Sequence, residues 1–363
     1  MTTILFFHSN ILKPGGASRV VLEQASRLQK LGFNCPIITT KVNSEITRNY
    51  SDLSFYCLSS FSTGQFFFWL TFPLFFAKLI SQTKRLLPEA IYCHSLALYW
   101  GFLYKLFYPQ SKLIIYFHDI GFPYFDSSLE TASLRFPFPQ IINFVKPIFS
   151  SINQQIIKKT NHLIANSQTS AKFIFQKYHR QPDSLIYPGF DESIFHPGTT
   201  AKGDYLVTVG RLEKIKNIST IISALPPKQK LIIAGDGPEK ANLQQQAYKL
   251  NKNVVFLGNQ TPSQLAPLYQ KARLGIFMSP AESFGLVAVE CLACGTPIIG
   301  VNKNGIAEIS QQFNQLLIKN CPTALHQLLT QKIPLKKLAS FSVTPYSATN
   351  QAQQLAQFFN QSL

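Results

Sequence analysis

The chain has 363 residues, which exceeds one ordinary domain and fits two of moderate size. Hydrophobic residues make up 46% of it and charged residues only 14%, which excludes intrinsic disorder, because a disordered chain has few apolar and many charged side chains. The 34 Lys and Arg outnumber the 17 Asp and Glu, giving a net charge of +17. This charge implies an anionic partner, which could be a phosphorylated metabolite, a nucleic acid or an acidic membrane surface.

Short apolar runs alternate with helical periodicity in both halves of the chain, a pattern typical of parallel α/β sheets. The candidate strands of the first half are Thr3–His8, Cys35–Thr39, Ala90–Cys93, Leu113–Phe117 and His162–Asn166. The candidate strands of the second half are Tyr205–Val209, Lys230–Ala234, Val254–Leu257, Leu274–Met278 and Pro297–Val301. Two such series predict two doubly wound, Rossmann-like domains rather than one barrel.

Turn-forming residues between 188 and 204 mark the join between the two series. We therefore expect an N-terminal domain over residues 1–187 and a C-terminal domain over residues 188–345. The closing segment, 346–363, is expected to be helical from Tyr346 to Phe359.

Helices are expected between the strands, and the first of them spans Ala17–Leu31. Val21, Ala25, Leu28 and Leu31 share one face of it, and Gly32 follows at the position where glycine commonly ends a helix. Residues 121–150 contain many prolines and phenylalanines and give no clear assignment.

The six cysteines are scattered through apolar stretches, which favours buried free thiols in a reducing cytosol. Cys291 and Cys294 form a C-x-x-C pair, but no second Cys or His pair accompanies it. The surrounding ECLACGTP is typical of a helix end, so core packing is favoured over a metal or redox site.

Neither a basic leader nor a cleavage site precedes the first candidate strand, so we expect a cytoplasmic protein. The most apolar segment, Phe66–Ile80, is shorter than the roughly 20 residues that span a bilayer. It also contains Pro73 and Lys78, which favours a buried or membrane-surface helix.

A glycine pair follows the first candidate strand in the sequence Pro14-Gly15-Gly16-Ala17. Glycine lets the backbone approach an anion closely, and the helix that follows presents unpaired N–H groups and the positive end of its dipole. The same residues also fit a tight strand-to-helix turn that binds nothing. A G-x-G-x-x-G fingerprint and a P-loop lysine are absent, so neither a dinucleotide site nor an NTPase is supported.

A basic loop, residues 209–217, follows the first strand of the second series. Ligands of open α/β sheets bind beyond the carboxyl ends of strands, which is where this loop lies. Arg211 can grip phosphate oxygens with its planar guanidinium, and Lys216 adds a mobile point charge. The alternative is an exposed basic loop in a basic protein.

Two carboxylates lie near the strand-to-helix turn that follows Leu274–Met278, the fourth candidate strand of the second series. Glu282 lies on the loop after the candidate strand, and Glu290 lies within the apolar helix LVAVECLA. A buried carboxylate is costly without a partner, so Glu290 is expected to face a ligand or a cation. Carboxylates also suit sugar and ribose hydroxyls. The alternatives are a solvated helix face or a salt bridge.

These segments resemble glycosyltransferase family 4, a large family of retaining enzymes. E-S-F-G-L-V-A-V-E is similar to its E-x7-E signature, G-R-L-E-K-I-K-N to its diphosphate-binding segment, and A-G-D-G-P-E to the G-x-G-P that follows. In the first half, G-G-A, F-H-D, I-A-N-S and P-G-F-D resemble further landmarks in the family's order. The resemblance implies the GT-B fold, in which two Rossmann-like domains face each other across a cleft. It also implies that residues 1–187 bind the acceptor and residues 188–345 the nucleotide-sugar donor, and that the closing helix in 346–363 crosses back to join the N-terminal domain.

The resemblance also implies roles for particular residues. Arg211 and Lys216 would bind the diphosphate of the donor. Glu290 would hold the nucleotide ribose, and Glu282 would approach the hydroxyls of the transferred sugar. The other residues placed at the donor site are Gly15, Gly16, His118, Ser283, Phe284, Gly285 and Leu286.

The implied reaction is transfer of a hexose-type sugar from a UDP- or GDP-sugar to a glycan or lipid-linked acceptor, with retention of configuration. Gly16 would meet the phosphate and His118 the sugar near the bond that breaks. Positive groups at the departing phosphate would make a cofactor or divalent metal unnecessary, and the sequence offers no Asp-x-Asp metal motif. One departure is Asn304, which stands where many relatives have the first residue of a Gly-Gly pair.

Basic residues beside apolar stretches suggest peripheral contact with the inner face of an anionic plasma membrane. These residues are Lys78, Lys84, Arg85, Lys105 and Lys112. The alternative is that they are the polar tips of helices packed on the core. Other open alternatives for the whole chain are an epimerase-like sugar-nucleotide enzyme and a basic nucleic-acid-binding protein, although no nucleic-acid-binding motif is present.

Overall fold

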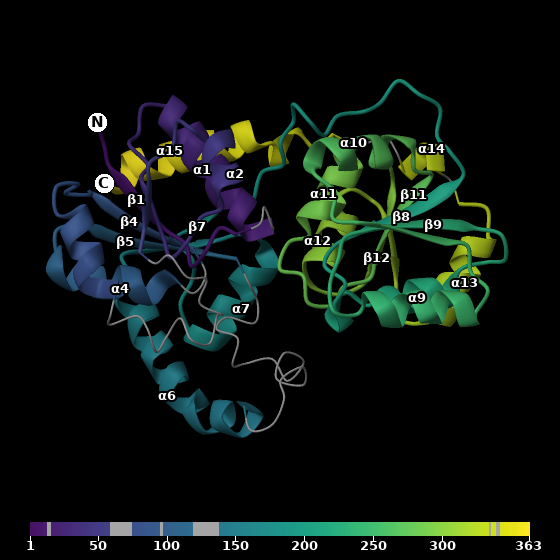
Figure 1. The fold of residues 1–363 in the computed structure, drawn as a ribbon, viewed down its shortest axis with the longest axis horizontal. Coiled ribbons are helices and arrows are strands. Elements are labelled where there is room, and N and C mark those ends of the chain that lie inside the picture. Colours follow the sequence, from purple (N-terminus) through teal and green to yellow (C-terminus); the bar gives the residue numbers. More distant parts are fainter. Residues whose placement is uncertain (13–15, 59–74, 95–96, 119–137, 334, 339–341) are drawn as a thin grey trace. The chain divides into compact units, whose positions relative to one another are not determined.

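A computed structural model of the protein describes residues 1–12, 16–58, 75–94, 97–118, 138–333, 335–338 and 342–363 (Figure 1). These residues form two compact units. The first contains Met1–Pro188 together with Ala348–Leu363, and the second contains Gly189–Ser347. The predicted fold class is confirmed, because each unit is a doubly wound α/β structure around its own parallel sheet.

The sheet of the first unit has seven parallel strands in the order β3-β2-β1-β4-β5-β6-β7. Its strands are β1 (Ile4–Phe7), β2 (Ile37–Thr39), β3 (Phe55–Cys57), β4 (Ala90–His94), β5 (Lys112–Phe117), β6 (His162–Ala165) and β7 (Ser184–Leu185). The five predicted strands are confirmed with ends shifted by no more than two residues. The edge strands β3 and β7 were missed, because two or three partly exposed residues carry too little periodicity to be recognised.

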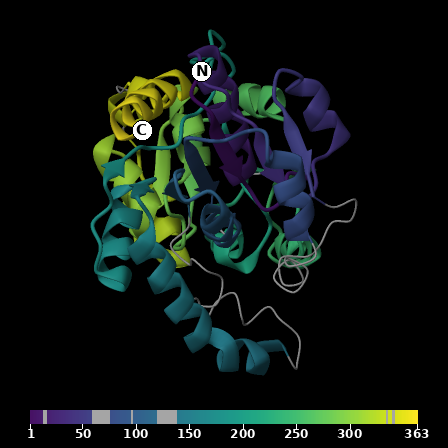
Figure 2. The same ribbon diagram turned by 90° about the vertical axis from the view of Figure 1, so that its left-hand side faces the viewer.

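Helices cover both faces of this sheet (Figures 1 and 2). In Figure 1, α1 (Gly16–Lys30), α2 (Ser44–Asn49) and α15 (Ala348–Ser362) lie on one side of the strands. On the other side lie α4 (Leu98–Phe107), α6 (Phe138–Lys159) and α7 (Gln168–Tyr178). Helix α6 occupies part of the stretch that the sequence left unassigned.

Helix α1 buries Val21, Ala25 and Leu28 of the predicted face. The prediction is wrong for Leu31, which follows the last helical residue, Lys30, and is 49% exposed. The helix ends before Gly32, whose φ of +93° is a conformation that side chains with a Cβ rarely adopt. The C-terminal helix α15 packs against α1, and Arg27 Nη1 donates to Thr349 Oγ1 over 2.7 Å. Two segments from opposite ends of the sequence therefore share one layer of the first unit.

The closing helix begins at Ala348 rather than at the predicted Tyr346, because Thr344–Tyr346 forms a 3-10 turn instead. The Tyr346 side chain is buried in the second unit, where its ring lies 5.6 Å from the rings of both Phe284 and Phe313. The predicted helix start is therefore wrong by two residues. The 3-10 turn that takes the place of the first helical residues is held by the buried ring of Tyr346.

The sheet of the second unit has six parallel strands in the order β10-β9-β8-β11-β12-β13. Its strands are β8 (Tyr205–Val209), β9 (Lys230–Ala234), β10 (Val254–Gly258), β11 (Leu274–Phe277), β12 (Ile298–Val301) and β13 (Leu316–Ile318). Its helices are α8 (Ile218–Ala224), α9 (Lys240–Lys249), α10 (Pro262–Lys271), α11 (Leu286–Ala293), α12 (Asn304–Gln312), α13 (Pro322–Thr330) and α14 (Leu335–Leu338). All five predicted strands are confirmed, and the edge strand β13 was missed.

All six cysteines are free, and four of them are buried. Cys291 and Cys294 are among the buried four, as core packing predicts. Cys57 and Cys321 are partly exposed, so the expectation that every thiol is buried is wrong for these two, which lie at the end of an edge strand and next to a helix start.

Most of the predicted apolar helix Phe66–Ile80 lies outside the described residues, as does most of 121–150. None of the helices within the described ranges is both long enough and apolar enough to cross a membrane.

Candidate functional site

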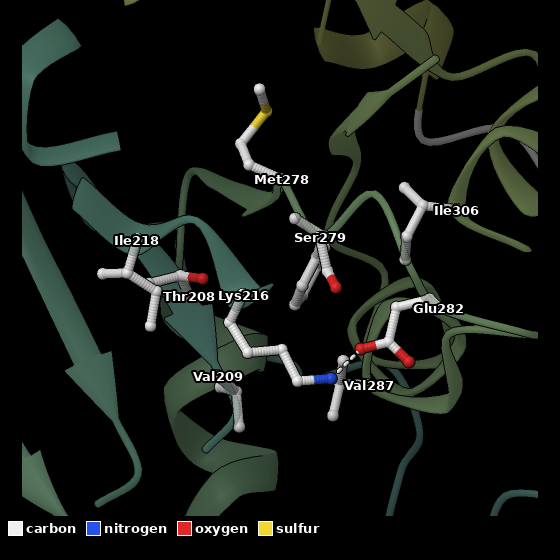
Figure 3. Close-up of a pocket in the computed structure, with 10 residues that line it drawn as sticks. Thr208, Val209, Lys216, Ile218, Met278, Ser279, Glu282, Val287 and Ile306 are labelled. Carbon is white, nitrogen blue, oxygen red and sulfur yellow. Dashed lines mark hydrogen bonds and ion pairs between the residues drawn. The ribbon is translucent and has the colours of Figure 1, made fainter. Parts of the chain in front are cut away.

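A pocket opens at the carboxyl ends of β8 and β11, which are neighbours in the second sheet (Figure 3). The chain runs from β8 to β9 on one side of the sheet and from β11 to β12 on the other, so the strand order reverses here. Such a switch point leaves a crevice in which α/β proteins bind ligands. The pocket is lined by Thr208, Val209, Lys216, Ile218, Phe277, Met278, Ser279, Glu282, Val287 and Ile306.

Lys216 and Glu282 face each other in this pocket, and Lys216 Nζ forms an ion pair with Glu282 Oε1 (Figure 3). Their side chains are 24% and 22% exposed, so the pair is neither fully solvated nor sealed from water. Lys216 closes the 3-10 turn Lys214–Lys216, which follows β8, and Glu282 lies on the loop after β11. Two residues far apart in the sequence thus place opposite charges side by side.

The loop that carries Glu282 is held by the start of α12. Asn304 has a φ of +52°, and its Nδ2 donates to the Pro280 carbonyl over 2.6 Å. The next N–H, that of Gly305, donates to the Glu282 carbonyl over 2.8 Å. A Cβ at Gly305 would lie 2.5 Å from the Phe284 backbone, so only glycine permits this approach.

Asn304 therefore occupies a left-handed conformation that glycine would adopt freely and that asparagine tolerates better than most residues. Asparagine in place of the first glycine of a Gly-Gly pair therefore still permits this backbone conformation, and its side chain adds the hydrogen bond to the Pro280 carbonyl. A further bond, from Ser279 Oγ to the Ile215 carbonyl over 3.2 Å, ties the same loop to the turn that carries Lys216.

Arg211 lies apart from the pocket lining. Its side chain is 76% exposed, and Nη1 forms an ion pair with Glu213 Oε1 over 2.9 Å. The backbone beside it is tightly packed, since a Cβ at Gly237 would lie 2.5 Å from the Leu212 carbonyl oxygen, and one at Gly235 would lie 1.9 Å from that of Gly210. The glycines of the A-G-D-G-P segment thus allow the loops after β8 and β9 to touch.

The E-x7-E segment places its two carboxylates in different environments. Glu282 faces the pocket, whereas the Glu290 side chain is fully buried within α11. Gly285 precedes α11 with a φ of +98°, and Leu286 is its first residue. Ser283 is partly exposed. Phe284, by contrast, is buried and packs against Tyr346 within the unit.

The first unit holds the remaining predicted site residues. Gly15 lies outside the described residues, and Gly16 begins α1, with open space where its Cβ would be. His118 follows β5, is only 6% exposed, and accepts a hydrogen bond at its carbonyl from Asn166 Nδ2 over 2.9 Å. Burial lowers the pKa of its imidazole to about 3, with a smaller contribution from His8.

Two histidines that the sequence did not single out lie beside His118. His8 follows β1 and His94 ends β4, so all three lie at the carboxyl ends of adjacent strands. Burial lowers the pKa of His8 to about 4 and holds that of His94 well below its usual value. His8 and His94 are each a polar residue at the end of an apolar strand, and this pattern could have identified them from the sequence.

Within the described ranges, no group of three or more His, Cys, Asp or Glu side chains is arranged to hold a metal ion. The three histidines are close but do not converge on one point.

Two family profiles match the chain. Residues 14–194 match Glycosyltransferase Family 4, and residues 190–340 match Glycosyl transferases group 1.

Among curated proteins, the chain is 28% identical over 189 residues to the D-inositol 3-phosphate glycosyltransferase of Segniliparus rotundus, covering 45% of this chain and 42% of that protein. It is 29% identical over 220 residues to the protein of the same name from Rhodococcus erythropolis, covering 52% of this chain and 50% of that one. The chain thus spans about half the length of the curated relatives it matches.

Among solved structures, HepE of Anabaena in complex with UDP and glucose superposes with a TM-score of 0.79 at 20% identity, over 99% of this chain and 100% of that one. Sucrose-phosphate synthase of Thermosynechococcus elongatus gives a TM-score of 0.77 at 18% identity, over 99% of both chains. These likenesses show the GT-B fold.

Proposed function

We propose that this chain, which belongs to glycosyltransferase family 4, moves a hexose-type sugar from a nucleotide-sugar donor to a hydroxyl acceptor with retention of configuration. The observation that carries the proposal is the pocket at the carboxyl ends of β8 and β11, where Lys216 and Glu282 form an ion pair. A nucleotide sugar offers both of the groups that these side chains prefer, because it joins an anionic diphosphate to a hydroxyl-rich ring.

Donor binding would exchange one set of contacts for another. The ammonium of Lys216 would turn to the diphosphate, and the carboxylate of Glu282 would accept hydrogen bonds from sugar hydroxyls. Each charge keeps a partner throughout, so the exchange avoids the cost of leaving a half-buried charge unpaired. The hydrogen bonds from Asn304 and Gly305 keep the Glu282 loop in place during the exchange.

Cleavage of the bond between the anomeric carbon and the diphosphate builds negative charge on the departing oxygen. Lys216 supplies a preorganised positive charge in the pocket. The N-terminus of α11, which begins at Leu286, and the loop before it, Ser283–Gly285, would add backbone N–H groups and the positive end of the helix dipole. Arg211 would join them by leaving Glu213, which its exposed position allows. These groups are proposed to act without a metal or cofactor.

Retention would follow from attack on the face that the leaving group departs from. The departing phosphate oxygen takes the acceptor's proton as the new glycosidic bond forms, so protons and charge balance without an enzyme carboxylate at the anomeric carbon. Glu290 is proposed to hold the nucleotide ribose from its buried position on α11. In the first unit, Gly16 is proposed to meet donor phosphate and His118 to contact the sugar.

A UDP-sugar is the donor to test first, ahead of a GDP-sugar. HepE of Anabaena is described in complex with UDP-glucose, and the pneumococcal O-GlcNAc transferase GtfA with UDP and GlcNAc. For the acceptor, we propose a glycan or lipid-linked molecule of cell-envelope polysaccharide or glycolipid synthesis. The lipopolysaccharide outer core galactosyltransferase WaaB, with a TM-score of 0.67 at 14% identity, shows one such reaction on this fold.

We also propose a cytoplasmic location with peripheral membrane contact through one end of the first sheet. Leu87, shortly before β4, and Leu106 and Phe107, shortly before β5, are exposed by 71%, 62% and 60%. Lys84 and Arg85, shortly before Leu87 in the chain, are also exposed. Exposed apolar and basic side chains together suit an anionic bilayer surface.

Two other basic residues are less available for membrane contact. Lys105 Nζ donates to the Ser111 carbonyl and to Asn161 Oδ1, each over 2.8 Å, and Lys78 Nζ donates to the Leu58 carbonyl over 3.0 Å. For Lys105 and Lys78 the packing alternative is therefore favoured.

A donor panel tests the activity. UDP- and GDP-linked glucose, galactose, mannose and N-acetylglucosamine are compared by thermal shift and by slow donor hydrolysis. The matching donor raises the melting temperature, because a ligand at 100 times its Kd stabilises the folded state by about 2.7 kcal/mol. No stabilisation and no hydrolysis with any donor, alongside retention on DNA, would overturn the proposal in favour of nucleic-acid binding.

A further inference from the structure

Three buried histidines lie side by side at the carboxyl edge of the first sheet, and the proposed reaction uses only one of them. Phe7 pairs with Cys93, and His94 pairs with Tyr116, so His8, His94 and His118 follow at nearly the same level of β1, β4 and β5. They are 6%, 0% and 6% exposed.

A direct hydrogen bond links two of these rings. His94 Nδ1 lies 2.7 Å from His118 Nε2, and the ring centroids are 5.0 Å apart. The third ring, that of His8, contacts a different residue: its Nε2 lies 3.1 Å from Ser18 Oγ, within hydrogen-bond distance. Of the two other histidines, His94 is thus the one whose hydrogen bond with His118 the structure shows.

The surroundings of His94 decide which ring donates. His94 Nε2 is buried and has no hydrogen-bond partner among the described residues. If His118 were the donor, neutral His94 would carry its proton on Nε2, leaving a buried N–H with no acceptor. Buried N–H groups without an acceptor are rarer in proteins than under-satisfied acceptors, so the proton belongs on His94 Nδ1.

Both rings are neutral near pH 7. The elements packed on His94 present Tyr92 and Tyr116, whose ring centroids lie 4.6 and 5.5 Å from its own, together with His8 and His118. Among the residues that the structure describes, none of these neighbours is a carboxylate, and burial lowers the pKa of all three histidines. The hydrogen bond is therefore one between two neutral imidazoles.

We propose that His94 is a positioning residue, whose Nδ1–H donates to His118 Nε2 and so fixes the proton of His118 on Nδ1. A free neutral imidazole in water favours the opposite form, with its proton on Nε2. The contact with His94 thus selects the less common tautomer and orients the His118 ring.

The consequence for the reaction rests on the proposed contact between His118 and the transferred sugar. A neutral ring with a fixed N–H can donate to a sugar oxygen without adding positive charge near an anomeric carbon that becomes oxocarbenium-like. A ring free to change tautomer or to take up a proton would lose that donor or repel the developing charge. His94 would in this way act on the sugar through His118 without touching it.

Nitrogen-15 NMR of the full chain, with labelled histidine and no donor present, tests the tautomer directly. The chain has seven histidines, and a His118→Asn variant assigns the signal of interest. Long-range proton–nitrogen spectra at pH 7 are expected to show the His118 proton on Nδ1. A proton on Nε2 overturns the proposal.

Two substitutions at His94 separate the hydrogen bond from packing. His94→Asn keeps an amide N–H near the position of Nδ1 and is expected to preserve the Nδ1–H form of His118. His94→Leu removes the donor and is expected to shift His118 mainly to Nε2–H. An unchanged spectrum in His94→Leu overturns the proposal. Tyr116→Phe is the matched control, because it changes a buried neighbour of His94 without touching the bond and should leave the tautomer as it was.

Kinetics with the matching donor give the second measurement. His94→Leu is expected to lower kcat by roughly ten- to one hundred-fold with little change in KM, as loss of one preorganised donor does, and His94→Asn should recover most of it. If His118→Asn leaves kcat unchanged while the tautomer is as expected, the role of His118 in the proposed function fails and the inference about His94 stands. If His118→Asn abolishes transfer but the proton lies on Nε2, only the inference about His94 fails.

Discussion

The two sheets present different chemistry at the same topological position. At the reversal between β1 and β4, the first unit places His8 and His94, buried and neutral. At the reversal between β8 and β11, the second unit places Lys216 and Glu282, charged and about one quarter exposed. The crevice at a switch point is a property of the fold, whereas its electrostatics come from the few side chains that end the strands.

This difference between the two sites would suit different roles in one reaction. A half-solvated ion pair can open at little cost and offer both charges to a ligand, because water screens them while they separate. A dry, neutral cluster holds its geometry through hydrogen bonds and packing and keeps protons in fixed places. The predictions below test whether the second unit supplies charge and the first supplies orientation.

The largest expected effect concerns the charge in the second unit. Lys216→Ala should lower kcat with the matching donor by about one hundred- to one thousand-fold, because one preorganised group that stabilises the leaving phosphate is lost. Lys214→Ala is the matched control, since Lys214 lies in the same turn but is exposed and outside the pocket. Steady-state kinetics measure both, and equal losses would show that the turn as a whole matters rather than the pocket lysine.

The next effect concerns the support of the Glu282 loop. Gly305→Ala should lower the free energy of unfolding by about 1–3 kcal/mol, because the new Cβ would meet the Phe284 backbone at 2.5 Å and backbone cannot move aside easily. Urea denaturation measures the loss. Gly16→Ala serves as the control, since its Cβ would enter open space. A fully stable Gly305→Ala would mean that the loop is free to shift, which removes the fixed geometry proposed for Glu282.

The third effect concerns the histidine cluster of the first unit and is a dependence of the free energy of unfolding on pH. An unfolded histidine binds a proton near pH 6.5, whereas folded His8 does so only near pH 4. The unfolded state therefore binds more protons between these values, so stability is complete above pH 6.5 and falls as the pH drops toward 4. For His8 alone the loss is on the order of 3 kcal/mol.

Denaturation curves between pH 7 and 4.5 measure this slope, and His8→Gln should make it shallower. The upper part of this window lies above the range in which Asp and Glu usually titrate, which keeps their contribution small there. Stability that stays constant or rises on acidification would show that the cluster accepts protons when folded, contrary to a neutral function.

The smallest effect is expected for the stability of the ion pair. Glu282→Gln should change the free energy of unfolding by less than about 1 kcal/mol, because a partly exposed pair contributes little. The same variant should lose most of its transfer activity. Thermal denaturation and kinetics on one preparation give both values, and a large loss of stability would mean that the pair serves the fold rather than the donor.

Local pattern sufficed to predict most of the strands and the residue types of the second pocket. Central strands such as Tyr205–Val209 and Lys230–Ala234 are mostly apolar runs, so their positions follow from the local sequence. Lys216 stands in the loop after such a strand, which is why the pattern points to it, whereas the role of Glu282 comes from the resemblance of its segment to E-x7-E. Edge strands were missed because they are short and partly exposed, which removes the apolar signal on which the prediction depends.

Tertiary structure alone decided which of the named residues meet. Lys216 and Glu282 stand 66 positions apart, and the stretch between them contains no signal that the two side chains pair; the pairing depends on β8 and β11 being neighbours. Likewise, Arg211 turns outward to Glu213, Phe284 packs in the core, and Asn304 adopts a left-handed conformation.

The histidine cluster shows the same division between sequence and structure. Its three members end strands that the sequence predicts, yet their contact depends on the order β1-β4-β5 and on the register between these strands. The sequence by itself determined which elements form and which side chains stand at their ends, because both are local properties. Strand order and register depend on how the crossover connections run and on which faces of the strands are buried, which are properties of the whole domain, and they bring His94 to His118 and Lys216 to Glu282.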